Sequence, residues 1–171
     1  MARYWLMKSE PSVFSIDNLA AAKEQTTRWD GVRNYQARNL LRHDIAVGDG
    51  VIFYHSSADP PAAAGTAKVV RAGYPDPTQF DPRDPGHDPA STRDDPRWWS
   101  VEIRAVEKLA RVVTLDELKA TRELSSMGVV RRGNRLSVQP VSDAELATVL
   151  RLAAAPLESD NPAPGPSKRA R

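Results

Sequence analysis

The pattern of apolar and polar residues predicts about five strands and four short helices. Short apolar stretches bounded by Gly or Pro predict strands near residues 4–8, 51–56, 64–74, 98–107 and 136–140. A Ser or Thr cap before a helical apolar repeat predicts helices near residues 15–23, 114–124 and 142–152, and a helical repeat from Asn34 onward predicts one near residues 34–43. Glu117 and Glu145 stand where a capping box needs them. Short strands separated by irregular loops predict a mixed α+β domain around a small curved sheet or barrel.

The most unusual stretch is residues 29–39, WDGVRNYQARN, which is too polar for a core and too aromatic for an ordinary turn. Gly31 allows a tight turn between Trp29 and Arg33. In the helical repeat that follows, four polar or aromatic side chains share one face of the helix: Tyr35, Arg38, Asn39 and Arg42. Such a face can be a solvated helix surface, or it can stack on flat rings and bind phosphates. The helix alone leaves both interpretations open.

Residues 75–97 contain six prolines and six aspartates, a density found nowhere else in the chain. Repeated Asp-Pro steps exclude a helix or a central strand. The segment is therefore either a disordered insertion or a rigid loop laid over the domain. A calcium site at Asp81, Asp84 and Asp88 is a further idea, but their spacing does not match an EF-hand loop, so we expect no metal.

Composition narrows the class of protein. A chain of 171 residues fits one domain, expected at residues 1–155, followed by a disordered Pro-rich basic tail at 156–171. The net charge is only +2, so any basic surface must be local. Absence of cysteine excludes disulfides, thiolate zinc sites and cysteine nucleophiles. The sequence has no long apolar run and no signal-peptide pattern, so we expect no membrane association and a cytoplasmic location, or a nuclear one in a eukaryote. We also expect a monomer.

Enzyme motifs are absent from the sequence: it contains no nucleophile elbow, P-loop, dinucleotide fingerprint or HExxH. His55, in an apolar strand, is equally compatible with a structural histidine and with a general base. We therefore expect no catalytic residue and no cofactor. An enzyme that acts on a nucleotide or another small planar ligand remains the alternative.

Three polar and aromatic clusters favour a binding site instead. They are residues 8–10 at one strand end, 29–38, and 54–56 at another strand end. Strand ends of a small barrel can converge on one concave mouth, where an aromatic face suits a planar base. Residues 28–42 are also locally basic, with four arginines against Asp30 alone. Each aromatic taken singly also fits a core position, but the three clusters together favour nucleic acid.

The sequence resembles the EVE domain family of the PUA-like group. The matching motifs span residues 3 to about 152: YWLMKSEP (4–11), WDGVRNYQARN (29–39), VIFYHS (51–56), YPDPT (74–78), PRWW (96–99) and RLSVQPV (135–141). The resemblance implies a PUA-like curved β-barrel decorated with short helices, similar to the YTH readers of methyladenine. It also implies that residues 75–97 form an ordered loop.

The resemblance further implies a reader of modified bases, notably methylated or hydroxymethylated cytosine in DNA, that flips the base into a pocket. RNA binding is one alternative, and a protein-interaction module built on the 75–97 loop and the basic tail is another. Carried over to this chain, the expected base-binding set is Lys8, Ser9, Glu10, Trp29, Val32, Arg33, Asn34, Tyr35, Tyr54, His55 and Ser56. Arg38 and Arg42 are expected to contact the backbone phosphates.

Overall fold

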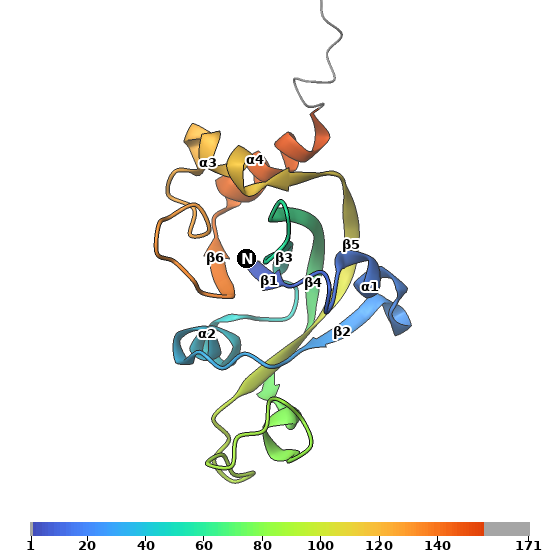
Figure 1. The fold of residues 1–171 in the computed structure, drawn as a ribbon, viewed down its shortest axis with the longest axis vertical. Coiled ribbons are helices and arrows are strands. Elements are labelled where there is room, and N and C mark those ends of the chain that lie inside the picture. Colours follow the sequence, from blue (N-terminus) through green and yellow to red (C-terminus); the bar gives the residue numbers. More distant parts are fainter. Residues whose placement is uncertain (1, 156–171) are drawn as a thin grey trace, which may run out of the picture.

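A computed structural model of the chain describes residues 2–155 (Figure 1). The predicted tail at 156–171 lies outside the described residues. The strands are β1 (Tyr4–Ser9), β2 (Thr26–Trp29), β3 (Gly50–His55), β4 (Ala62–Pro75), β5 (Trp99–Thr114) and β6 (Val138–Val141). The α-helices are α1 (Ile16–Ala21), α2 (Tyr35–Asn39), α3 (Leu115–Ala120) and α4 (Asp143–Ala154), with single turns at Lys23–Gln25, Leu40–Asp44, Pro77–Phe80 and Arg122–Leu124.

The six strands form one mixed sheet in the order β2-β5-β4-β3-β1-β6. All neighbours are antiparallel except β1 and β3, which run parallel. The long β4 and β5 bend along their length, and several register shifts between them accompany this curvature (Figure 1). The α+β prediction is confirmed. The barrel is not closed, because the two four-residue edge strands β2 and β6 do not pair with each other in residues 2–155.

Strand β2 is the element that the sequence pattern did not reveal. Its four residues include Thr26, Thr27 and Arg28, and only Trp29 is buried. A short edge strand with one apolar residue has no alternation to recognise. Its pairing with β5 places Trp29 opposite Val101, so Trp29 ends a strand and does not lie in a turn.

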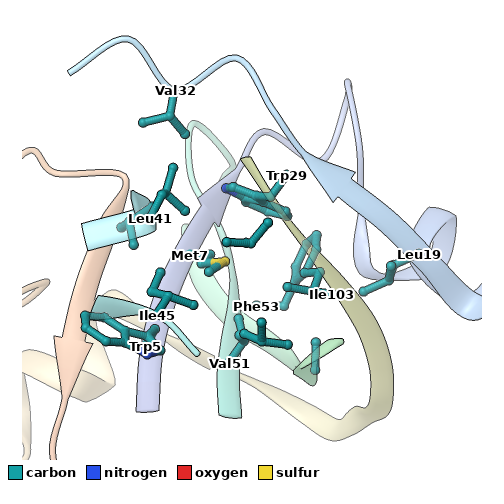
Figure 2. Packing of buried hydrophobic residues seen from close by; sticks show 14 of the residues in the cluster. Trp5, Met7, Leu19, Trp29, Val32, Leu41, Ile45, Val51, Phe53 and Ile103 are labelled. Carbon is teal, nitrogen blue, oxygen red and sulfur yellow. The ribbon is translucent and has the colours of Figure 1, made fainter. Parts of the chain in front are cut away.

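Two apolar cores lie on opposite faces of the sheet. Trp5 and Met7 in β1 and Phe53 in β3 contribute to the first core, together with Trp29 (Figure 2). Leu6, from the alternate position of β1, contributes to the second core under α3 and α4. This alternation follows from the two-residue period of a strand. It determines which side chains of β1 and β3 lie on the same face of the sheet as Trp29.

Helix boundaries follow the predicted caps closely. Ser15 and Ser142 both form capping boxes at α1 and α4. Thr114 caps α3, but the capping box expected at Glu117 does not form. The Glu117 carboxylate accepts instead a hydrogen bond of 2.7 Å from Arg111 Nη1. An ion pair within reach outweighs the local back-bond at this position.

The 75–97 segment is an ordered loop, as the resemblance implied, and Gln79 organises it. The Gln79 side chain is fully buried. Its Nε2 donates to the carbonyls of Asp76 and Trp98 at 2.7 and 2.8 Å, and its Oε1 accepts from Ser91 Oγ and two backbone N–H groups. The carboxylates of Asp81, Asp84 and Asp88 each accept a backbone N–H two residues ahead. Within residues 2–155, no group of three or more His, Cys, Asp or Glu side chains is arranged to hold a metal ion.

No helix in the described part of the chain has the length and apolar character needed to cross a membrane.

Candidate nucleic-acid interface

A pocket of about 600 Å³ opens where β1 and β2 end. This volume lies within the range of about 300–1,000 Å³ that small-molecule sites occupy. The C-terminal end of β1, the turn that follows it, β2 and the segment after β2 form its walls. The lining residues are Lys8, Ser9, Glu10, Val13, Phe14, Thr27, Arg28, Trp29, Asp30, Gly31, Val32, Arg33 and Ser137.

Two aromatic residues line this pocket. Trp29 is 8% exposed and packs edge-on against Phe53, with ring centroids 5.5 Å apart. Phe14, half-buried, immediately precedes the α1 cap at Ser15, where an apolar residue commonly packs onto the first helical turn. Trp98 lies elsewhere, so the pocket offers two aromatic faces and not a cage of several tryptophans.

Hydrogen bonds fix the polar edge of the pocket. Ser9 Oγ donates to the carbonyl of Phe14 at 2.6 Å, which leaves the Ser9 oxygen lone pairs free to accept. The backbone N–H of Lys8 donates to the carbonyl of Ser137 at 2.8 Å and brings Ser137 to the pocket. Burial lowers the pKa of the Lys8 amine. Arg28 and Asp30 form an ion pair of 2.9 Å, with both side chains more than a third exposed, at the rim.

Arg33 fixes one pocket wall to the 75–97 loop. Its guanidinium donates to Asp76 Oδ2 at 2.9 Å, to Thr78 Oγ1 at 3.0 Å and to the carbonyl of Gly86 at 2.6 Å. The guanidinium also donates to the carbonyl of Val32, and a group that donates to four acceptors is not free to bind a phosphate. Arg33 belongs to the expected base-binding set, and its side chain reaches the pocket as part of the wall that these hydrogen bonds fix.

Asp76 is the other half of this connection and is fully buried. Its carboxylate accepts four hydrogen bonds: from Gly31 N at 2.8 Å, Arg33 Nη1 at 2.9 Å, Thr78 N at 2.8 Å and Thr78 Oγ1 at 2.6 Å. Burial alone would raise the pKa of Asp76, but these hydrogen bonds outweigh it and hold the pKa below its ordinary value. Asp76 therefore stays ionised and holds Gly31 and Arg33 in place.

The outer face of α2 has the predicted composition but lies beside the pocket. Asn34 accepts from Ala37 N and caps the helix. Tyr35 is 53% exposed and stacks on Trp98 at 4.9 Å, and neither residue lines the pocket. Arg38 lies over the Tyr35 ring at 4.9 Å and donates to the carbonyl of Arg97. Arg42 lies over the Trp99 ring at 4.7 Å.

The third predicted cluster does not reach the pocket. Tyr54 is 2% exposed in the second core, and burial raises its pKa to about 12. Burial also lowers the pKa of His55, whose Nε2 accepts the backbone N–H of Ile16 at 3.1 Å. That acceptor bond occupies the lone pair that a general base would need. Ser56 bonds to the carbonyl of Ser9 through its backbone N–H, which connects β3 to the pocket without lining it.

The structure thus brings together Lys8, Ser9, Glu10, Trp29, Val32 and Arg33 of the expected base-binding set. It does not bring Asn34, Tyr35, Tyr54, His55 or Ser56 to the same pocket. Sequence reasoning missed five lining residues, namely Val13, Phe14, Thr27, Arg28 and Ser137, while Asp30 and Gly31 lie within the predicted cluster at 29–38 without being in the base-binding set. The apolar residue before the Ser15 cap was the one local signal that could have singled out Phe14.

The α+β domain contains an open sheet with an aromatic and polar pocket at its strand ends, an arrangement typical of a ligand-binding module. The EVE domain model matches residues 3–152, and the chain belongs to the EVE domain family. Thymocyte nuclear protein 1 of Rattus norvegicus is 43% identical over 169 residues, covering 89% of this chain and 74% of that protein. The Homo sapiens protein of the same name is 41% identical, with the same coverage.

Solved structures support the same fold. A Pseudomonas putida protein is 47% identical, with a TM-score of 0.84 over 88% of this chain and 99% of its own. Human THYN1, crystallised in complex with DNA that contains 5-methylcytosine, is 41% identical, with a TM-score of 0.85 over 91% of this chain and 100% of its own. The YTH domain of Zygosaccharomyces rouxii MRB1, at 13% identity and a TM-score of 0.51, shares the fold alone. The PUA-like fold prediction is thereby confirmed.

Proposed function

We propose that this chain is a nucleic-acid-binding module that reads methylated or hydroxymethylated cytosine in DNA by taking the flipped base into the pocket between β1 and β2. The observation that carries the proposal is the pocket itself, a hollow large enough to admit a base, with Trp29 and Phe14 in its wall. The human relative crystallised with 5-methylcytosine DNA, 41% identical over nearly the whole chain, supports the choice of ligand.

The chemistry of the lining suits a cytosine. Phe14 and Trp29 provide faces or edges against which the ring can pack, and Val13 and Val32 add apolar surface for a 5-methyl group. Glu10, Asp30 and the Ser9 oxygen are acceptors for the exocyclic amine. Lys8 is a donor for the ring nitrogen or the carbonyl. The pocket lining thus offers both hydrogen-bond acceptors and a hydrogen-bond donor to the polar edge of cytosine.

The energies are compatible with base flipping. Extrusion from the duplex costs a few kcal/mol, and stacking on an aromatic residue returns about 1–3 kcal/mol. Hydrogen bonds to the edge of the base offset the remainder. Burial of one additional methyl group adds about 0.8 kcal/mol, or about fourfold in affinity. A modest but measurable preference for the methylated base follows.

The proposal assigns the protein no catalysis. His55 was the one residue considered as a general base, and its Nε2 lone pair already accepts the Ile16 N–H. The lining of the pocket includes no histidine. Both observations favour a reader over an enzyme that acts on a nucleotide.

Equilibrium titrations with three duplexes of one sequence test the proposal. The duplexes carry cytosine, 5-methylcytosine or 5-hydroxymethylcytosine at one central position. We expect about fourfold or greater preference for a modified duplex, with every base recovered unchanged when the nucleosides are analysed afterwards. Equal affinity for all three duplexes would refute base reading, and a chemically altered base would show an enzyme instead. An RNA of the same sequence is the control for the DNA assignment, and tighter binding to it would contradict that assignment.

A further inference from the structure

A second basic surface lies next to the pocket, in a part of the chain that none of the predicted site residues occupies. Arg131, Arg132 and Arg135 stand within five residues, and residues 125–142 contain no Asp or Glu. All three arginines are exposed. Within residues 2–155 none of them forms an ion pair, whereas Arg3, Arg28, Arg33, Arg71, Arg83, Arg111 and Arg151 all do. Among residues 2–155, no carboxylate therefore pairs with the positive charge of these three arginines.

Arg135 lines a hollow that lies next to the pocket, and Arg131 and Arg132 come directly before the lining residues Gly133 and Asn134 in the chain. This hollow of about 400 Å³ is lined by Asn34, Gln36, Gly133, Asn134, Arg135 and Leu136. The pocket begins directly beside it on both chain segments, at Arg33 on one side and at Ser137 on the other. Figure 1 shows the loop that enters β6 lying next to α2, consistent with this arrangement. A DNA strand whose flipped base occupies the pocket can therefore cross the hollow while it stays in contact with the protein surface.

The 131–135 loop is held in place before any ligand arrives. Asn134 Oδ1 accepts hydrogen bonds from Leu136 N at 3.2 Å and from Gln139 Nε2 at 3.3 Å. Gln139 is 1% exposed and also donates to the carbonyl of Leu136 at 2.8 Å. Leu136 packs against the first core, and Val129 is buried in the second. Because the backbone is anchored on both sides, little ordering free energy opposes binding there.

We propose that Arg131, Arg132 and Arg135 form a phosphate-binding edge that holds the DNA backbone flanking the flipped base. Asn34, Gln36 and Asn134 at the hollow offer amides to sugar and phosphate oxygens. Guanidinium groups bind phosphates in bidentate geometry and carry no information about the base. The edge rests on the proposed function and adds a division of labour to it. The pocket discriminates between bases, and the 131–135 loop supplies affinity for any sequence.

The test compares two triple variants that remove the same charge. One carries Arg131→Gln, Arg132→Gln and Arg135→Gln. The matched control carries Arg104→Gln, Arg122→Gln and Arg151→Gln, three exposed arginines that line neither the pocket nor the hollow. Affinity for the methylated and unmethylated duplexes is measured at several salt concentrations, and thermal melting confirms that both variants are folded.

We expect the loop variant to bind both duplexes at least about tenfold more weakly, with an unchanged ratio between them. The slope of log affinity against log salt should become shallower by up to about 2.7, at about 0.9 for each lost phosphate contact. The control variant should change the slope far less. A loop variant that behaves like the control would overturn the inference while leaving base reading intact. A wild type that binds through the loop without discriminating between the duplexes would instead refute base reading, and a wild type that binds neither duplex would refute both.

Discussion

Trp29→Ala is expected to abolish discrimination between methylated and unmethylated DNA and to lower the free energy of unfolding by about 3–5 kcal/mol. Trp29 is 8% exposed and contributes both to the first core and to the pocket wall. Removal of the indole leaves a cavity beside Phe53 and takes away the larger of the two aromatic surfaces that face the ligand. Chemical denaturation and titration with the duplex pair measure the two effects separately.

Loss of stability alone could weaken binding, so the control must share that loss. Phe53→Ala removes the ring that packs edge-on against Trp29, from a fully buried position that does not line the pocket. We expect a comparable drop in stability with the preference for methylated DNA retained. The milder pair Trp29→Leu and Phe53→Leu serves if the alanine variants do not fold. Equal loss of preference in both members of a pair would contradict a direct role for Trp29.

Asp76→Asn is the second substitution with a large expected effect. The amide is neutral, and its NH₂ group would confront the donors that now point at the carboxylate. We expect the free energy of unfolding to fall by about 3 kcal/mol, because a buried partner of Arg33 is removed. The wall formed by Gly31 and Arg33 loses its support, so preference for the methylated duplex should fall as well. Denaturation curves and the duplex titration check both results.

The pH dependence gives this prediction a distinct signature. Hydrogen bonds hold the pKa of Asp76 below its ordinary value, so the folded state binds this proton less readily than the unfolded state does. The contribution to stability is complete above the unfolded pKa of about 3.9 and is lost as the pH falls through the folded pKa. The difference in stability between wild type and Asp76→Asn should therefore be constant near neutral pH and shrink below about pH 4.

Asp84→Asn is the matched control for Asp76→Asn. Asp84 lies in the same loop, and its Oδ1 accepts only the local N–H of Gly86, which an amide oxygen also can accept. We expect little change in stability or in base preference. A difference between Asp76→Asn and wild type that persisted undiminished at acid pH would show that the carboxylate charge is not what stabilises the wall.

The features of the fold that were predicted correctly from the sequence are those that local chemistry determines. A Ser side chain that caps the first turn fixes where a helix begins regardless of the rest of the molecule, so the helix starts at Ser15 and Ser142 were predicted correctly. The outward position of Tyr35 in α2 follows from the 3.6-residue period in the same way: Tyr35 is exposed, and Ala37 of the same helix is fully buried. These features need contacts only within a few residues.

The parts that sequence reasoning did not reach depend on long-range geometry. Phe53 and Tyr54 are both apolar positions of β3, and alternation alone cannot say which of them shares a core with Trp29. The four residues of β2 become a strand only by pairing with β5, more than 70 residues later along the chain. Arg33 and Asp76 lie 43 residues apart in the chain and meet only in the folded structure. Such long-range contacts depend on the topology of the fold, which a local sequence pattern does not reveal.

The NMR signal of the base itself reports whether the modified base occupies the pocket between β1 and β2. A duplex carrying one ¹³C-labelled 5-methyl group on cytosine is titrated with the protein until the DNA is saturated. The methyl resonance is expected to shift upfield through the ring currents of Trp29 and Phe14, and to show cross-relaxation with the methyl groups of Val13 or Val32. A methyl resonance that stays at the position of the free duplex while the DNA is fully bound would contradict the account.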